Sequence, residues 1–259
     1  MIITALREKR INQKFISYFE NSATYDFITI LGEGTFGVTY LIFDKKTNKK
    51  VVLKRLKTKY AKKRKSLEHF HKEMNCLQKN MHQNFPAFIS ENTMEEIPYF
   101  IMEYKDGKTF EQLIFDEGKV YSTRDTIQIV KQLLKMVMTI HSYGIVHRDL
   151  RIPNIIQNND ELSIVDFGLA CSIDNEAIIN QIKNPKKSAS YISDLYHIGH
   201  FMLYLLYSTY EISNRKEKSW QEELQLTKDI VDFIEKLLLI QSPFQNALAA
   251  YEALNSIEY

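Results

Sequence analysis

The chain has 259 residues, of which 44% are hydrophobic and 25% charged, and its formal net charge is +2. These values are typical of a globular protein with a sizeable core, built as one large domain or as two lobes that share a cleft. The net charge is too small to indicate a nucleic-acid or membrane-binding protein by itself. We therefore expect no nucleic-acid partner.

The cysteines and the N-terminus indicate the compartment. Cys76 and Cys171 are far apart and do not have metal-binding spacing, which favours reduced thiols over a disulfide scaffold. The first 15 residues carry charge where a signal peptide needs an apolar stretch. The most apolar run, residues 201–206, is too short to span a bilayer. We expect a cytoplasmic protein without a transmembrane segment.

The first hundred residues predict a small sheet with helices. Apolar and basic positions alternate over residues 1–22, which favours an amphipathic helix packed on the first lobe, or at a membrane surface as the less favoured alternative. Residues 26–56 read as three strands, with GEGTFG between the first two. A helical stripe follows over residues 66–81. Two further strands are expected within residues 85–104.

The remainder is expected to be mainly helical. Ser122 and Asp125 resemble a capping box that starts a helix, and Gly144 is a natural stop for it. Two short apolar runs lie around residues 155–166, and helices are expected at about 194–210, at about 222–240 and near the C-terminus. The two lobes are expected to join at residues 103–107.

Two features of the first lobe suggest phosphate chemistry. The glycine-rich GEGTFG is followed by a strand, which favours a hairpin that lies over phosphates, although a plain β-hairpin is the alternative. Lys54 ends the third strand, and Glu73 on the following helix could hold it in place as a fixed cation. A surface lysine and a solvated helix acid are the simpler interpretations of these two residues.

The strongest signal is HRDLRIPN at residues 147–154, followed by DFG at residues 166–168. The carboxylate of Asp149 can accept a hydrogen bond from an attacking hydroxyl, and the side-chain oxygen of Asn154 can ligate magnesium. Asp166 is a second hard oxygen ligand that suits magnesium bridging phosphates. Two unrelated acidic turns would rarely produce both motifs at this spacing.

In their order and approximate spacing, GEGTFG, VVLK, Glu73, HRDLRIPN and DFG resemble the eukaryotic-type (Hanks-type) protein kinase family, in particular short bacterial serine/threonine kinase-like proteins. The resemblance implies an α+β, bilobal protein-kinase-like fold. Its expected parts are an N-terminal extension (1–25), a small β-rich N-lobe (26–103) and a mainly helical, reduced C-lobe with a shortened activation segment (104–259).

The resemblance also implies roles and cofactors, namely ATP and Mg²⁺, with Mn²⁺ as an alternative. Lys54 would contact the α- and β-phosphates and pair with Glu73, Asp149 would be the catalytic base, and Asn154 and Asp166 would bind the metal. Asp194 would anchor the catalytic loop, and His147, Phe167 and Leu77 would stack. The residues implied to bind ATP are Gly32, Glu33, Gly34, Thr35, Phe36, Gly37, Thr39, Val52, Lys54, Met102, Glu103, Tyr104, Lys105 and Ile156.

The sequence departs from the family pattern at four places. Thr39 replaces a valine and Val52 replaces an alanine over the adenine. Arg151 replaces the catalytic-loop lysine that helps neutralise the transferred phosphate, so it is expected to take that role with a different geometry. No APE motif is present, and only 28 positions separate Asp166 from Asp194.

The activation segment raises a further expectation. Arg148 precedes Asp149, and in the family an arginine at this position often pairs with a phosphate on the activation segment. The candidate acceptors are Ser172, Ser188, Ser190 and Tyr191.

Three functions follow from these features. The first is a serine/threonine protein kinase with a protein substrate. The shortened segment favours the second, a kinase-like enzyme that phosphorylates a small molecule. The third is a pseudokinase that binds nucleotide and partners. Residues 54–65, in which eight of twelve residues are Lys or Arg, are expected to be a solvated connection, with docking of an acidic partner as the alternative.

Overall fold

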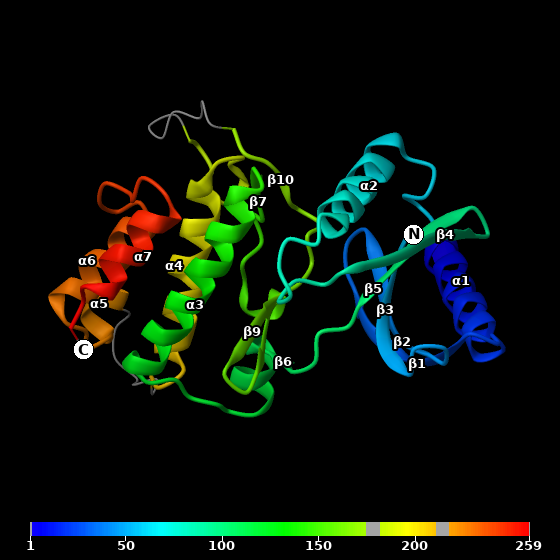
Figure 1. The fold of residues 1–259 in the computed structure, drawn as a ribbon, viewed down its shortest axis with the longest axis horizontal. Coiled ribbons are helices and arrows are strands. Elements are labelled where there is room, and N and C mark those ends of the chain that lie inside the picture. Colours follow the sequence, from blue (N-terminus) through cyan, green and yellow to red (C-terminus); the bar gives the residue numbers. More distant parts are fainter. Residues whose placement is uncertain (1, 175–181, 211–217, 259) are drawn as a thin grey trace. The chain divides into compact units, whose positions relative to one another are not determined.

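The computed structural model describes residues 2–174, 182–210 and 218–258. The chain forms two compact units, Met1–Lys105 and Asp106–Tyr259 (Figure 1). The first unit combines an antiparallel sheet with helices, and the second is mainly helical. The predicted α+β fold class is confirmed.

The first unit contains a five-stranded antiparallel sheet in the order β1-β2-β3-β5-β4. All five strands were predicted from the sequence. Their bounds are β1 (Tyr25–Glu33), β2 (Gly37–Asp44), β3 (Lys49–Leu56), β4 (Phe88–Met94) and β5 (Ile97–Glu103).

Helices α1 (Ile2–Glu20) and α2 (Arg64–Gln78) lie on opposite faces of this sheet (Figure 1). Successive side chains of a strand point to opposite faces. On β3, Lys54 pairs with a residue of α2, whereas Arg55 pairs with a residue of α1. The predicted stripe on α2 is present, although the helix ends at Gln78 and not at residue 81.

Helix α1 packs on the sheet through aromatic side chains. Phe15 and Phe19 are buried, and the ring of Phe15 lies 6.1 Å from that of Tyr40 and 5.7 Å from that of Tyr99. Burying such rings stabilises the packing by a few kcal/mol, at about 25 cal/mol per Å² of apolar surface. The prediction of a helix packed on the first unit is confirmed.

The second unit is built around the buried helices α3 and α4, which pack against each other and against α7 and α6. Its helices are α3 (Thr123–Ser142), α4 (Tyr191–Tyr207), α5 (Trp220–Glu223), α6 (Lys228–Leu237) and α7 (Ala247–Asn255). A three-stranded sheet is formed by β6 (Lys108–Thr109), β8 (Ile155–Asn158) and β9 (Glu161–Ile164), and a two-stranded one by β7 (Ile145–Val146) and β10 (Cys171–Ser172).

The predicted boundaries of α3 are confirmed. The hydroxyl of Ser122 accepts from the backbone N–H of Asp125 at 3.1 Å, and the Asp125 carboxylate accepts from the Ser122 N–H at 3.1 Å, which completes a capping box. Gly144, just beyond the helix, has φ +68°, a conformation that glycine adopts without strain. The helix predicted at 222–240 is divided into α5 and α6, and the π-helix at Gln112–Asp116 was not predicted.

The basic run at residues 54–65 is only in part the solvated connection that we expected, since Lys59 and residues 62–65 are exposed. Its first residues belong to β3, and Arg55 has no exposed surface. Farther along, Lys62 and Arg64 form exposed ion pairs with Glu96 and Glu68. The number of Lys and Arg residues in this run could not show that Arg55 is buried, because its burial follows from the alternation of side chains along β3.

Cys76 and Cys171 are both free cysteines, which agrees with the prediction of reduced thiols. None of the helices in the described part of the chain combines the length and the hydropathy needed to cross a lipid bilayer.

Candidate active site

The predicted site residues fall into two sets, one on each unit. The glycine-rich segment, Thr39, Val52, Lys54, Glu73 and residues 102–105 belong to the first unit. Asp149, Arg151, Asn154, Ile156 and Asp166 belong to the second unit.

In the first unit, the predicted lysine–glutamate pair is formed. The Nζ atom of Lys54 lies 2.6 Å from Oε1 of Glu73. Only 4% of the Glu73 side chain and 16% of the Lys54 side chain is exposed. A charge-assisted hydrogen bond with this burial is stronger than a surface pair, so it fixes the ammonium group between β3 and α2.

The predicted adenine-side residues share the sheet face of Lys54. Residues directly opposite in an antiparallel pair have side chains on the same face, as do positions i and i+2 of one strand. Thr39 lies opposite Lys54, and Val52, two residues before Lys54, lies opposite Met102. The register therefore brings these four side chains onto one face.

The glycine-rich segment forms a tight connection between β1 and β2. The N–H of Gly34 donates to the carbonyl of Gly37 at 3.0 Å, and the carbonyl of Phe36 accepts from the N–H of Lys57 at 2.8 Å. A Cβ atom added to Gly37 would lie 2.7 Å from the backbone carbonyl of Arg55, so only glycine permits this approach to β3. Gly32, Glu33 and Thr35 complete the segment and are exposed.

The predicted hinge, residues 103–105, is fixed to the segment that precedes β4. The N–H of Glu103 donates to the carbonyl of Ala87 at 2.8 Å, and its carboxylate accepts from the Ala87 N–H at 3.2 Å. The Nζ atom of Lys105 lies 2.7 Å from the Glu103 carboxylate and 2.6 Å from the carbonyl of Gln83. Tyr104 lies between them, with Nζ of Lys50 over its ring.

In the second unit, Asp194 of α4 anchors the loop that carries HRDLRIPN. Its fully buried carboxylate accepts hydrogen bonds from the backbone N–H groups of His147 at 2.9 Å and Arg148 at 2.7 Å, and lies 2.9 Å from Nε2 of His141. Burial opposes the ionisation of Asp194, but these hydrogen bonds and the nearby histidines outweigh it and hold its pKa below the ordinary value.

Asp149 is held in a fixed orientation by Asn154 and Arg151. The Nδ2 atom of Asn154 donates to Oδ2 of Asp149 at 2.7 Å and to its backbone carbonyl at 2.9 Å. Arg151 donates from Nε to Oδ1 and from Nη2 to Oδ2, the latter at 3.0 Å. A carboxylate has about four lone-pair sites, so Oδ1 retains the capacity to accept one more hydrogen bond, from a substrate hydroxyl.

Asn154 and Asp166 lie on adjacent segments, because the N–H of Val165 donates to the carbonyl of Asn154 at 2.9 Å. Since Nδ2 of Asn154 is committed to Asp149, its Oδ1 is the atom that could ligate a cation. No cluster of three or more His, Cys, Asp or Glu side chains suited to a metal occurs among residues 2–174, 182–210 and 218–258. Two oxygen ligands fit Mg²⁺ that arrives with phosphates and water, rather than a metal in an all-protein cage.

The metal-ligand candidate Asp166 and the loop residue Arg148 adopt unusual backbone conformations. Arg148 has φ +66° and Asp166 has φ +62°, both in the left-handed region that costs a non-glycine residue about 1–3 kcal/mol. The rings of Phe167 and His147 pack edge to face with centroids 4.7 Å apart, and both residues are buried. Burial lowers the pKa of His147 below its ordinary value. Leu77, which the resemblance would add to this stack, is a buried residue of α2 in the first unit.

Ile156 is placed by the small sheet of the second unit. It lies opposite Thr109, in the pairing of β8 with β6. Gly107, with φ +123°, approaches it so closely that an added Cβ would lie 2.7 Å from its Cγ2.

The activation segment is closed at its base. The N–H of Asp174 donates to the carbonyl of Ala189 at 2.6 Å. Residues 175–181 of this segment lie outside the described residues. Arg148, whose pairing with a phosphate stays a prediction, donates from Nη2 to the carbonyl of Lys187 at 2.9 Å and from Nη1 to Sγ of Cys171 at 3.4 Å. Of the candidate phosphate acceptors, Ser190 is buried.

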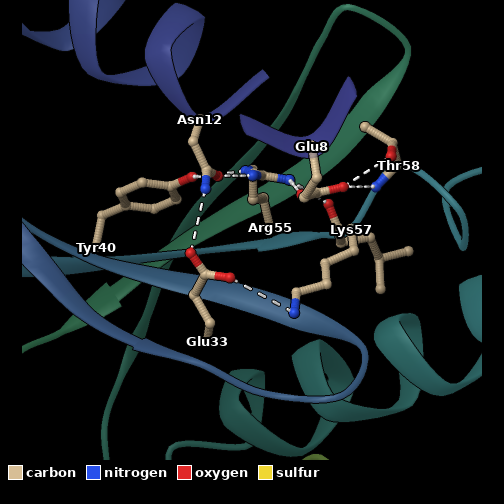
Figure 2. A network of polar contacts seen from close by, with 8 residues as sticks. Glu8, Asn12, Glu33, Tyr40, Arg55, Lys57 and Thr58 are labelled. Carbon is tan, nitrogen blue, oxygen red and sulfur yellow. Dashed lines mark hydrogen bonds and ion pairs between the residues drawn. The ribbon is translucent and has the colours of Figure 1, made fainter. Parts of the chain in front are cut away.

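Sequence reasoning missed the residues that support the glycine-rich segment from α1. Asn12 donates from Nδ2 to Oε1 of Glu33 at 3.2 Å. Its Oδ1 atom accepts from Nη2 of Arg55 (Figure 2). The available signal was the position of Arg55 directly after Lys54 on a strand, because alternation directs it to the opposite face.

Comparison with known proteins gives the same class of protein as the geometry. The protein kinase domain family matches residues 25–245. The "Probable serine/threonine-protein kinase YbdM" of Bacillus subtilis (strain 168) is 34% identical over 225 residues, which cover 87% of this chain and 86% of that protein.

Longer kinases match over part of their length. "Serine/threonine-protein kinase PrkC" of Bacillus subtilis is 26% identical over 158 residues, which cover 61% of this chain and 24% of PrkC. "Probable serine/threonine-protein kinase CPE1738" of Clostridium perfringens is 28% identical over 189 residues, which cover 68% of this chain and 27% of that protein. These matches define a kinase, which is a phosphotransferase. The chain belongs to the protein kinase family.

Proposed function

We propose that this chain transfers the γ-phosphate of ATP to serine or threonine hydroxyls of protein substrates, in the presence of Mg²⁺. The observation that carries the proposal is the catalytic loop, in which Asn154 and Arg151 orient the carboxylate of Asp149 and the buried Asp194 anchors the backbone. The names of the relatives support serine and threonine as acceptors.

The residues of the two units would divide the task. Lys54, fixed by Glu73, would bind the α- and β-phosphates, and the glycine-rich segment would lie over them. In the other unit, Oδ1 of Asp149 would accept a hydrogen bond from the attacking hydroxyl and orient its oxygen towards the γ-phosphate. Asn154 and Asp166 would hold Mg²⁺, which neutralises negative charge on the phosphates when it is bound.

Arg151 would supply positive charge beside the transferred phosphate. The side chain of Arg151 is 58% exposed although its guanidinium donates to both oxygens of Asp149, and these hydrogen bonds raise its pKa further. Because the guanidinium is planar and permanently charged, it can contact Asp149 and a phosphate oxygen at once, which a lysine would do with one ammonium group.

The test measures transfer of labelled γ-phosphate to the protein itself and to casein, followed by acid hydrolysis and separation of the phosphoamino acids. Asp149→Asn should lower the rate by about 10²–10⁴-fold, because a positioned base contributes that much. Asp160→Asn is the matched control, since Asp160 lies in the exposed β8–β9 turn. Phosphotyrosine as the main product would contradict the proposed specificity, and transfer that survives Asp149→Asn would contradict the assigned base.

The short activation segment supports a second candidate, a kinase-like enzyme with a small-molecule acceptor. Only 14 residues lie between Asp174 and Ala189, whose backbone bond closes the segment, so little chain is available to bind an extended peptide. This candidate predicts ATP turnover that rises when a metabolite mixture is added, without labelled protein. Nucleotide binding without any turnover would instead indicate a pseudokinase.

A further inference from the structure

One side of helix α1 carries polar and aromatic side chains directed at the sheet. Glu8, Asn12 and Phe15 follow at spacings of four and three residues, so they lie on one face of the helix. Phe15 is buried in the aromatic cluster with Tyr40. Glu8 and Asn12 extend the same face towards β3 and the glycine-rich segment (Figure 2).

The buried Arg55 fixes α1 to the strand that carries Lys54. Its Nη1 lies 2.8 Å from Oε1 of Glu8, its Nε donates to the hydroxyl of Tyr40 at 2.7 Å, and its Nη2 donates to Oδ1 of Asn12. A guanidinium without exposed surface is stable only when its N–H groups have acceptors. Helix α1 supplies two of these acceptors, so the helix and β3 are held together at the residue after Lys54.

A second link joins α1 to both strands of the glycine-rich hairpin. The Nδ2 atom of Asn12 donates to Oε1 of Glu33, the last residue of β1, at 3.2 Å. The Oδ1 atom of Asn12 accepts from the hydroxyl of Tyr40 on β2 at 2.8 Å. The other carboxylate oxygen of Glu33 lies 3.7 Å from Nζ of Lys57. One amide side chain therefore contacts β1, β2 and β3.

We propose that helix α1 positions the glycine-rich hairpin for nucleotide binding, and that Asn12 is the positioning residue. This inference rests on the proposed function, since the hairpin contacts phosphates only in an ATP-binding enzyme. A Cβ atom added to Gly32 would meet nothing within 4 Å, and one added to Gly34 would meet only the carbonyl oxygen of Gly37 at 4.0 Å. These glycines give the segment conformational freedom. A tether at the base of the hairpin reduces this freedom before ATP binds, which lowers the entropy lost on binding.

The decisive variant is Asn12→Asp, which preserves size and keeps the acceptor for Arg55 and Tyr40. It removes the donor to Glu33 and sets two carboxylates against each other. We expect the KM for ATP to rise about fivefold with kcat within about twofold, because the lost hydrogen bond contributes to binding and not to the chemical step. Hydrogen exchange of the unliganded protein should become faster at the amides of residues 32–38.

Two controls separate positioning from general stabilisation. Lys14→Gln removes the partly exposed ion pair between α1 and Glu95 in the β4–β5 connection, and should leave the KM for ATP and the exchange at residues 32–38 unchanged. Asn12→Asp combined with Glu33→Gln restores the hydrogen bond in the opposite direction, with residue 33 as the donor. The KM for ATP of this double variant should equal that of Glu33→Gln alone. Because both proteins carry the same change at residue 33, a direct contact of Glu33 with ATP does not affect this comparison.

The outcomes are distinguishable. The inference is overturned if Asn12→Asp leaves both KM and hydrogen exchange unchanged, if Lys14→Gln has the same effect, or if the double variant does not recover. If the wild-type protein binds no Mg·ADP and transfers no phosphate, the proposed function fails. Hydrogen exchange at residues 32–38 then still decides whether Asn12 holds the hairpin.

Discussion

The ion pair between Glu8 and Arg55 makes a specific prediction about stability. Arg55 has no exposed side-chain surface, and Glu8 is 15% exposed. Removing one partner of a buried ion pair costs about 3–5 kcal/mol. Three other oxygens still accept hydrogen bonds from Arg55 in Glu8→Gln. We therefore expect this variant to lower the free energy of unfolding by about 3 kcal/mol, the lower limit of that range.

The reverse substitution should cost less. In Arg55→Met, Glu8 keeps hydrogen bonds from the N–H and the hydroxyl of Thr58 at 2.9 and 2.7 Å, and it retains some contact with solvent. The double variant leaves no unpaired buried charge. We therefore expect it to be more stable than the sum of the two single effects implies, with a coupling energy of at least about 1.5 kcal/mol.

The assay is urea unfolding followed by two probes. Trp220 is the single tryptophan and lies in the second unit, so its fluorescence reports that unit, whereas far-ultraviolet circular dichroism reports both. The shift should appear in the dichroism transition. Glu96→Gln, which breaks the exposed pair with Lys62, is the matched control and should produce no measurable change. Equal effects of Glu8→Gln and Glu96→Gln, or additive single effects, would refute the reasoning.

Three further predictions concern other parts of the chain. Gly37→Ala should lower the free energy of unfolding by about 1–3 kcal/mol, measured by urea titration, because the added Cβ would lie 2.7 Å from a carbonyl of β3. Asp194→Asn should lower kcat about 100-fold, because the catalytic loop would lose a charged acceptor for its backbone N–H groups; unchanged kcat would contradict this anchoring role. Burial lowers the pKa values of His147, His197 and His200. The unfolded chain therefore binds protons first as the pH falls through about 6.5, and the second unit should lose up to about 1.4 kcal/mol per pH unit for each histidine, with a smaller slope in His200→Gln.

Much of the fold could be predicted because local sequence and tertiary structure agree. The strands β1 to β3 are rich in β-branched and aromatic residues and are separated by clear turn signals. The capping box at Ser122 specifies the start of α3 through hydrogen bonds between residues three positions apart. The pairing of Lys54 with Glu73 was also predictable, first from the position of Glu73 on the helix that follows the third strand and then from the resemblance to a family.

The support of the site could not be predicted in the same way. The side chains of Asn12 and Glu33 meet across 21 positions of sequence, and neither residue type indicates a partner. The basic residues at 54–65 suggested solvation, whereas β-strand alternation and the aromatic face of α1 bury Arg55. The contact of Arg148 with Lys187 is made through a backbone carbonyl, which every residue possesses, so no sequence pattern indicates it.

The location of α1 and α7 has a practical consequence for anyone who prepares fragments of this protein. The family match spans residues 25–245, whereas α1 precedes it and α7 follows it. A recombinant piece cut at those limits would leave Arg55 without its carboxylate and would uncover the surface of α3 on which Ala250 and Leu254 pack. Poor solubility of such a piece would reflect where it was cut, and would say nothing about the enzyme.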